Sequence, residues 1–233
     1  SIFIAGVVAD HATIARWHEL GVKDSKLLTR KRRDELARVI RSTAFTTSTR
    51  EITPALIDDK SLNLNAWEMI TVLQIIQNLR RRTRFIDVYI DNWEVSRKVF
   101  DRRLASLATA ESKDLLARGN IVLRMRLLAR LNLIAEHQAD ENYTIVGAAS
   151  ILAKSASDRQ YDRYRKIYGD FGSGNPGDRK TRHFLWLHRH APVPIIRTSW
   201  KTFRVLAELE NPDKNPLDGL KDTDDTTERG SLE

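Results

Sequence analysis

Short apolar runs with the character of strands alternate with longer amphipathic segments through most of this 233-residue chain. The first run, residues 2–9, is almost continuously apolar, which is typical of a strand covered on both faces. The apolar spacing predicts further strands over 44–52, 85–90 and 131–136. It predicts helices over 29–41, 64–79, 95–118, 143–168, 178–190 and 198–206. Strands separated by helices predict an α/β fold whose sheet is at least partly parallel.

The net charge of +8 conceals a difference between the body of the chain and its end. Residues 207–233 hold nine acidic and three basic side chains and almost no large apolar ones, so burial cannot offset the entropy of ordering them. We expect a disordered acidic tail there. Residues 1–206 then form one folded domain with a net charge of +14, which favours an acidic partner such as nucleic acid.

The sequence contains no cysteine, which excludes disulfides, zinc–thiolate centres and thiol nucleophiles. This composition fits a reducing compartment, and we expect the protein to be cytoplasmic. No apolar run approaches the roughly 18 residues that a membrane-spanning helix needs, so no membrane association is expected. The chain opens within a strand-like run and not with a basic leader, so we expect the sequence to start inside a domain.

Two carboxylates follow predicted strands, where open α/β sheets place their ligands. Asp91 comes directly after the strand over 85–90, and Asp140 lies between the strand over 131–136 and the next helix. If they converge, they form a hard-oxygen site for Mg²⁺ or Mn²⁺ that can act on a phosphodiester. In the alternative interpretation Asp91 is a turn residue and Asp140 interacts with a helix dipole. In the predicted strand over 85–90, Ile86, Val88 and Ile90 share the face opposite that of Asp91.

A basic run over residues 22–33 lies at a predicted junction between a loop and a helix. Ser25, Lys26 and backbone donors there are placed to hold phosphates, although a solvated helix face explains an isolated basic run equally simply. The glycine-rich loop over 172–177 lacks the Gly-Lys-Ser/Thr ending of a nucleotide-binding loop, so it is first of all a turn. Four histidines have no metal-ligand spacing and are expected at the surface or in packing: His137, His183, His188 and His190.

These segments together resemble the type 2 ribonucleases H, or ribonuclease HII family, in their order and spacing. The resemblance rests on residues 22–33, on His137-Gln138-Ala139-Asp140, and on residues 146–154 with Asp158 and Arg159. Residues 168–174 and 197–202 are similar to the archaeal branch of that family. The similarity extends from about residue 2 to residue 206 and leaves the acidic tail uncovered.

The resemblance implies a ribonuclease H-like fold, with a mixed sheet flanked by helices and a C-terminal helical extension. It implies a hydrolase that cleaves the RNA strand of RNA/DNA hybrids and acts at ribonucleotides embedded in duplex DNA, in DNA replication and repair. Family catalysis uses four carboxylates and divalent metal, Mg²⁺ or Mn²⁺, with two ions expected. Asp91 matches the third carboxylate and Asp140 the fourth. The products would be 3′-hydroxyl and 5′-phosphate ends.

The sequence departs from the family pattern at two places. The family's first strand carries an Asp-Glu-Ala-Gly-Arg-Gly motif with the other two carboxylates, and we expect it a few residues before Ser1. Without it, we expect this chain by itself to bind Mg²⁺ poorly and to cleave nothing. The second departure is Asn175, which stands where the family usually has a tyrosine that stacks beneath the ribonucleotide sugar.

The basic surface is expected to hold a hybrid or ribonucleotide-containing duplex against a monomeric protein. The residues expected to contact nucleic acid are Ser25, Lys26, Ser150, Lys154, Asn175 and Lys201. Two other functions stay open at this point. One is a non-catalytic nucleic-acid-binding relative that lost the first carboxylate pair. The other is a different nuclease of the same fold, such as a junction resolvase.

Overall fold

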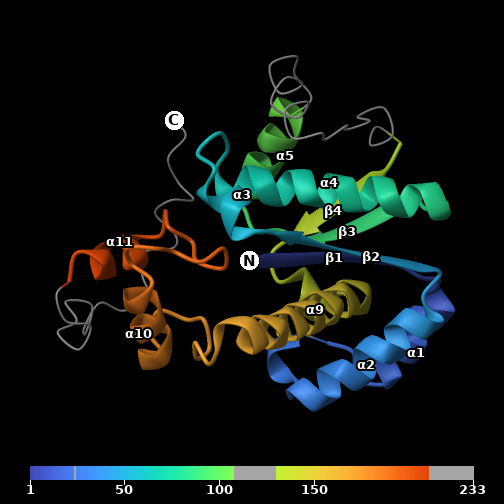
Figure 1. Cartoon of the computed structure of the whole chain (residues 1–233). Coiled ribbons are helices and arrows are strands. Elements are labelled where there is room, and N and C mark those ends of the chain that lie inside the picture. Colours follow the sequence, from blue (N-terminus) through green and yellow to red (C-terminus); the bar gives the residue numbers. More distant parts are fainter. Residues whose placement is uncertain (24, 108–129, 210–233) are drawn as a thin grey trace. The chain divides into compact units, whose positions relative to one another are not determined.

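The computed structural model describes residues 1–23, 25–107 and 130–209 (Figure 1). The chain divides into two compact units. The first, here called the strand unit, contains residues Ile2–Ile52 and Asn65–Ser157. The second, called the helical unit, contains Ser1, Thr53–Leu64 and the residues from Asp158 onward. All four described strands belong to the strand unit, as do the two carboxylates predicted to bind metal.

The strands form two ladders, one antiparallel and one parallel, which confirms the expected mixed β structure. β1 (Ile2–Val8) pairs with β2 (Thr46–Ile52), and Ile2 lies opposite Ile52. β3 (Asp87–Asp91) runs parallel to β4 (Asn132–Glu136), so that Asp91 is the register partner of Glu136. The last residues of β3 and β4 therefore lie side by side at one edge.

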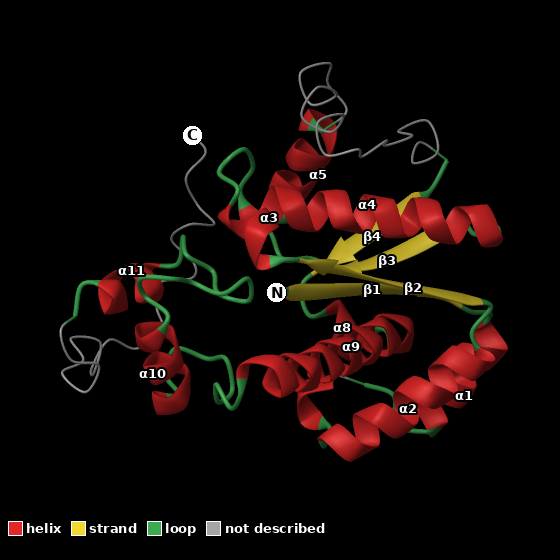
Figure 2. Cartoon of the chain, viewed as in Figure 1, coloured by secondary structure: helices red, strands yellow, loops and turns green. Residues whose placement is uncertain are grey.

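Helices flank these ladders, as Figure 2 shows. In the strand unit they are α1 (His11–Glu19), the 3₁₀ turn η1 (Ser25–Leu27), α2 (Arg30–Thr43), α4 (Leu64–Arg82), α5 (Arg97–Ser106) and α8 (Ala139–Asn142). The long helix α9 (Thr144–Tyr168) begins in the strand unit and ends in the helical unit. The helical unit also contains α3 (Pro54–Asp58), α10 (Arg179–Leu187) and α11 (Lys201–Ala207).

Side-chain caps fix where several helices begin. Thr29 accepts a hydrogen bond from the backbone nitrogen of Arg32 at 3.3 Å and begins α2, as predicted. Asp178 caps α10 by accepting from the nitrogen of Lys180 at 2.9 Å. Asp10 does the same for α1, accepting from the nitrogen of Thr13 at 2.8 Å.

Three short helices were not among the sequence predictions. α1, α3 and α8 contain nine, five and four residues, too few for an apolar period to stand out. The third predicted strand also begins later than expected, at Asp87. Ile86, which the prediction placed within this strand, precedes it and is 68% exposed. The guanidinium of Arg80 donates to the carbonyl of Phe85 at 2.5 Å and holds this segment as a loop.

The core of the strand unit packs α1, α2 and α9 together. The fully buried members of this cluster are Trp17, Val22, Leu36, Ala37, Ile40, Ala148, Ile151 and Leu152. Within the helices that the apolar spacing predicted over 29–41 and 143–168, Leu36, Ile40 and Leu152 are buried, while Val39 and Ala156 are half-buried. Trp17 satisfies its indole nitrogen by donating to the hydroxyl of Thr43 at 2.9 Å.

The helical unit has a separate aromatic core. Its buried members are Phe171, Phe184, Leu185, Ile196, Phe203 and Leu206. Asp58, the last residue of α3, ties this unit together by accepting four hydrogen bonds from the backbone nitrogens and hydroxyls of Thr198 and Ser199. Among the helices within the described ranges, none is long and apolar enough to cross a membrane. Residues 108–118 of the predicted helix and residues 210–233 of the expected tail lie outside those ranges.

Candidate functional site

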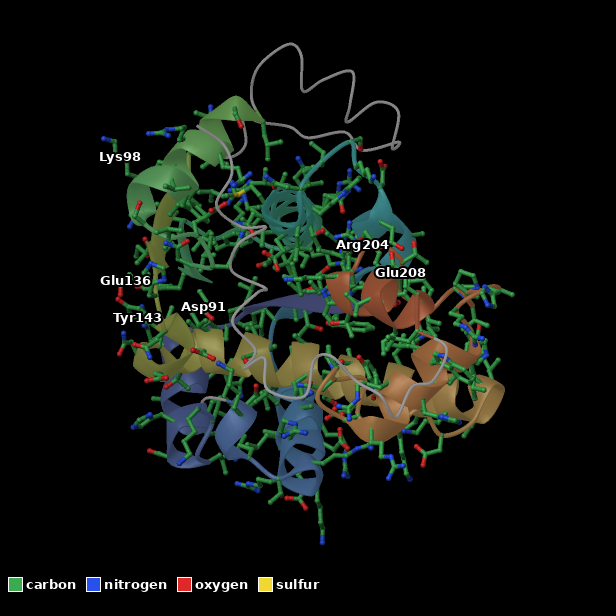
Figure 3. All side chains as sticks on the ribbon, turned by 90° about the vertical axis from the view of Figure 1, so that its left-hand side faces the viewer. Asp91, Lys98, Glu136, Tyr143, Arg204 and Glu208 are labelled. Atoms are coloured by element: carbon green, nitrogen blue, oxygen red, sulfur yellow. The ribbon has the colours of Figure 1, made fainter. Side chains whose placement is uncertain are left out.

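Acidic side chains collect where β3 and β4 end, the edge at which parallel strands bring their carboxyl ends together. Asp91 ends β3 and Glu136 ends β4, and the backbone nitrogen of Asn92 donates to the Glu136 carbonyl at 2.8 Å. Figure 3 shows Asp91, Glu136 and Tyr143 at this end of the strand unit. Asp140 follows four residues after Glu136, in α8.

A sharp turn brings Asp140 back toward Asp91. Gln138 adopts the left-handed conformation with φ 56°, which is uncommon for a residue with a side chain. The chain then enters α8, and the first nitrogen of that helix, on Ala139, donates to Oδ1 of Asp91 at 3.3 Å. Asp91 and Asp140 line one cleft, so the structure brings together the two carboxylates that the sequence singled out.

The two carboxylates differ in their contact with water. Asp91 is exposed, whereas Asp140 is only 6% exposed. Both side chains present hard oxygen donors to the same cleft, which suits a divalent cation such as Mg²⁺ or Mn²⁺. Within the described part of the chain, no group of three or more His, Cys, Asp or Glu is arranged to hold a metal ion, so this donor set is partial.

Glu136, at the end of β4, is hydrogen-bonded to a tyrosine. The hydroxyl of Tyr143 donates to the Glu136 carboxylate, with its oxygen 3.1 and 3.0 Å from Oε1 and Oε2. The same hydrogen bond raises the pKa of the Tyr143 phenol. The ring of Tyr143 packs on that of Tyr89, with 4.7 Å between centroids. The sequence analysis did not identify the contacts among Glu136, Tyr143 and Tyr89. The position of Glu136 at the end of a predicted strand is a signal that could have marked it as a site residue.

The basic run over residues 22–33 meets the segment over residues 146–154 through a pair of serines. The hydroxyls of Ser25 and Ser150 are 2.9 Å apart, although 125 residues separate them. Ser25 is 4% exposed, and Arg33 fixes its loop by donating to the carbonyls of Ser25 and Leu28 at 3.3 and 2.6 Å. Ser150 lines the same cleft as Asp91 and Asp140.

Gly147 permits this close approach. A β-carbon at residue 147 would lie 3.2 Å from both the Asp140 carbonyl oxygen and the Lys23 carbonyl carbon. Only a glycine lets α9 press against these two backbone segments without displacing them. Lys26 and Lys154 are both exposed, and Lys154 lies one helical turn after Ser150.

The remaining two predicted residues, Asn175 and Lys201, belong to the helical unit. Asn175 lies in a tightly bonded turn, where its side-chain oxygen accepts from the nitrogen of Gly177 at 2.8 Å. The nitrogen of Gly174 donates to the Thr181 hydroxyl at 3.0 Å. These bonds confirm the loop over 172–177 as a turn. Lys201 is exposed at the first position of α11.

The cleft that Asp91, Asp140 and Ser150 share, here called the central cleft, has a volume of about 510 Å³. Its lining comes entirely from the strand unit, with β1 on one side and β3 on the other. The backbone of both strands, apolar side chains of α4 and α9, and the two carboxylates all contribute to it. The cleft thus combines a negatively charged end with a long apolar body.

Comparisons with known proteins agree with this geometry. The family model described as Ribonuclease HII matches residues 1–203. The Ribonuclease HII of Thermococcus sibiricus is 35% identical over 217 residues, which cover 92% of this chain and 88% of that protein. The Ribonuclease HII of Pyrococcus furiosus is 34% identical over 219 residues, which cover 93% and 88%.

Solved structures give the same result. The archaeal RNase HII from Archaeoglobus fulgidus, solved as a PCNA complex, is 30% identical, with a TM-score of 0.70 and coverage of 91% of this chain and 92% of that chain. Ribonuclease H2 from Pyrococcus horikoshii OT3 is 27% identical, with a TM-score of 0.68 and coverage of 92% and 100%. An RNase HIII solved in complex with Mn²⁺ is 14% identical with a TM-score of 0.63, which is a likeness of fold alone.

Proposed function

The chain belongs to the ribonuclease HII family, and we propose that it cleaves the RNA strand of RNA/DNA hybrids and acts at ribonucleotides embedded in duplex DNA. Membership makes it a hydrolase of the ribonuclease H type, acting on nucleic acid. The observation that carries the finer proposal is that Asp91, Asp140 and Ser150 line one cleft, with Ser25 hydrogen-bonded to Ser150. We further propose that it works as a monomer in the cytoplasm, in DNA replication and repair.

Asp91 and Asp140 would hold Mg²⁺ or Mn²⁺, since the family depends on divalent metal and both residues offer hard oxygen donors. Two such ions, when bound, would supply an activated water and charge stabilisation for the departing 3′ oxygen, leaving 3′-hydroxyl and 5′-phosphate ends. The amide of Ala139 orients Asp91, and burial keeps Asp140 away from competing water. The chain's own contribution is therefore to fix two carboxylates in a defined arrangement.

The serine pair is suited to the sugar of the substrate. A hydroxyl such as that of Ser150 both donates and accepts, and so does the 2′-hydroxyl that distinguishes RNA from DNA. Lys26 and Lys154 would contact phosphates near it, and Lys201 and Asn175 would contact nucleic acid from the helical unit. Asn175 offers an amide where an aromatic ring would stack, so we expect it to bind by hydrogen bonds only.

The test compares the 233-residue chain with the same chain extended before Ser1 by the family's Asp-Glu-Ala-Gly-Arg-Gly strand. We expect the extended chain to cleave a labelled RNA/DNA hybrid in Mg²⁺ or Mn²⁺. Asp91→Asn or Asp140→Asn should slow it about 100-fold or more, beyond the loss typical of outer-shell partners. Asp101→Asn is the matched control, because Asp101 is exposed on α5 and pairs with Arg97.

Three outcomes distinguish the functions. Binding of the hybrid without cleavage by the extended chain would favour a nucleic-acid-binding relative. Faster cleavage of a four-way junction than of a hybrid would favour a resolvase. The 233-residue chain alone should bind Mg²⁺ weakly and cleave nothing, because two carboxylates leave most of the cation charge uncompensated, and robust hybrid cleavage by it would contradict this.

A further inference from the structure

Glu94 is a buried carboxylate that the proposed mechanism does not use. It lies three residues after Asp91, in the segment between β3 and α5, and its side chain is fully buried. Its Oε1 accepts from the guanidinium Nε of Arg103, and its Oε2 accepts from the side-chain nitrogen of Asn65 at 3.0 Å. Arg103 belongs to α5 and Asn65 to α4, so this one carboxylate holds two helices against the segment that follows Asp91.

Further hydrogen bonds connect Glu94 to the end of β3. The backbone nitrogen of Glu94 donates to Oδ1 of Asn92 at 3.0 Å, and the backbone nitrogen of Asn92 donates to the Glu136 carbonyl at 2.8 Å. Asn92 and Glu94 are 5% and 1% exposed. A path of hydrogen bonds therefore leads from the Glu94 carboxylate to the residue next to Asp91.

The side chain of Asp91 depends on this backbone for its direction. Asp91 is exposed, and the backbone nitrogen of Ala139 donates to its Oδ1 at 3.3 Å, which is long for such a bond. A contact of this length restrains a carboxylate only weakly. The position of the backbone at the end of β3 therefore decides where the oxygens of Asp91 lie.

A buried ion pair is a costly way to hold elements together. Both charges must leave water, and apolar side chains of similar volume often hold packed elements as firmly. What the pair of Glu94 and Arg103 adds is direction, because charge-assisted hydrogen bonds are short and directional. Fixed direction matters beside Asp91, since metal ligands must be held in a defined geometry by the residues around them.

We propose that Glu94 is a positioning residue for Asp91. Through Asn65 and Arg103 it fixes the segment after β3, and through Asn92 it fixes the end of the strand itself. It thereby sets the direction in which Asp91 offers its oxygens to a divalent cation. The proposal rests on the proposed function, which makes Asp91 a metal ligand. Glu94 acts from behind the site, because it is not among the described residues that line the central cleft.

Amide hydrogen exchange of the 233-residue chain, followed by NMR, reads this position directly. The amide of Ala139 reports its bond to Asp91, and the amide of Asn92 reports its bond to β4. Glu94→Gln keeps the shape of the side chain and removes its charge. We expect both amides to exchange about tenfold faster in this variant, which corresponds to the loss of roughly one hydrogen bond. The rates are taken relative to those of α2, which report global unfolding.

Two further variants separate positioning from stability. Glu94→Gln leaves Arg103 without its charged partner and should also unfold more easily. Glu94→Leu combined with Arg103→Met replaces the pair by apolar side chains, so it should recover most of the unfolding temperature while both amides still exchange fast. The matched control is Ser155→Ala, because Ser155 is fully buried and donates to Asp34 at 2.8 Å. It should lower stability and leave the two amides slow.

A second measurement concerns the metal and not cleavage. Mn²⁺ titrated into the same chain broadens the NMR signals of nearby amides, and weak binding is enough for this effect. We expect the Mn²⁺ concentration that halves the Asp91 amide signal to rise about tenfold in Glu94→Gln and in the double variant, as is typical when a residue that orients a metal ligand is lost. It should not change in Ser155→Ala.

The proposal is wrong if the Ala139 and Asn92 amides stay slow in Glu94→Gln. It is also wrong if they slow again in the double variant as stability returns, because the ion pair is then a structural link only. Should neither Glu94 variant fold, Asn65→Ala removes one donor and no charge, and unchanged exchange there has the same meaning. Cleavage enters none of these measurements, so a chain that cleaves no hybrid would refute the proposed function and leave these results standing.

Discussion

Two exposed lysines adjoin the Ser25–Ser150 contact along the chain: Lys26 follows Ser25 directly, and Lys154 lies one helical turn after Ser150. Each phosphate contact that is lost should lower the slope of log affinity against log salt by roughly 0.9. We expect Lys26→Ala and Lys154→Ala each to weaken hybrid binding and to reduce this slope by about that amount. The measurement is a salt titration of affinity in Ca²⁺ or without metal.

Lys98→Ala serves as the control for these variants, because Lys98 is an exposed lysine on α5 (Figure 3). An unchanged slope for Lys26→Ala would remove Lys26 from the interface. An equal decrease for Lys98→Ala would show that the slope reports net charge and not a local contact.

Gly147 offers a test of how tightly the site is assembled. In an ordinary helix position, alanine is more stable than glycine by about 1 kcal/mol. Here the added β-carbon meets backbone atoms at 3.2 Å, so Gly147→Ala should instead destabilise the chain by about 1–3 kcal/mol and weaken hybrid binding. Chemical denaturation measures the first effect, with Ser157→Ala on the same helix as the control. A stabilised Gly147→Ala variant would mean that the backbone of Lys23 moves easily.

At the scale of elements, Asp58 links α3 to the segment that precedes α11. Partial burial raises the pKa of its carboxyl, but the hydrogen bonds from Ser199 and Thr198 outweigh it, so the pKa lies below its ordinary value. A carboxyl with a lowered folded-state pKa stabilises the fold above its unfolded pKa, and this contribution is lost as the pH falls through the folded value.

We therefore expect Asp58→Asn to lower the unfolding temperature at pH 7, and to lower it progressively less as the pH falls below the ordinary range of a carboxyl pKa, because the parent chain then loses the stabilisation that charged Asp58 provides. Thermal unfolding followed by circular dichroism across this range checks the sign. Asp59→Asn, at the exposed neighbouring position, is the control. A deficit that stays constant with pH would assign the loss to packing and not to the charge.

The longer elements could be predicted from sequence because their apolar residues repeat over several turns or alternate within a strand. α2, α4 and α9 begin within about one residue of the predicted positions. The signals that were present but missed are local ones, such as Thr53 followed by Pro54 at the start of α3, a cap followed by a proline at the first helical position.

Part of the candidate site could likewise be predicted from sequence, and part could not. Asp91 and Asp140 could be chosen from sequence because both follow strands. The contact between Ser25 and Ser150 joins segments 125 residues apart, and the turn at Gln138 depends on a left-handed residue that is not a glycine. Local patterns carry no signal for either.

At the scale of the whole molecule, charge is distributed unevenly along the chain. Residues 210–233 contain eight acidic and three basic side chains. We expect this acidic segment to compete with nucleic acid for the basic surface, so that a chain ending at Leu209 binds a hybrid more tightly at low salt and equally at high salt. Leu209 must be kept, because its carbonyl accepts from the Trp186 indole at 2.9 Å.

The control for this truncation is the 233-residue chain with the eight acidic residues changed to Asn or Gln. It should bind as tightly as the truncated chain if charge is the cause. Affinities that do not differ between the truncated and the unaltered 233-residue chains at low salt would exclude the competition.

The distance along the chain between Ser25 and Ser150 also bears on how the protein reaches its native state. Closing a loop of this length costs more entropy than any turn within an element, although the cost rises by only about 0.6 kcal/mol with each doubling of length. Contacts between residues so far apart in the sequence form after local helices and hairpins. The Ser25–Ser150 contact is therefore expected to be among the last parts of the molecule to form, and if this pair reads the sugar as proposed, a partly folded chain cannot yet tell RNA from DNA.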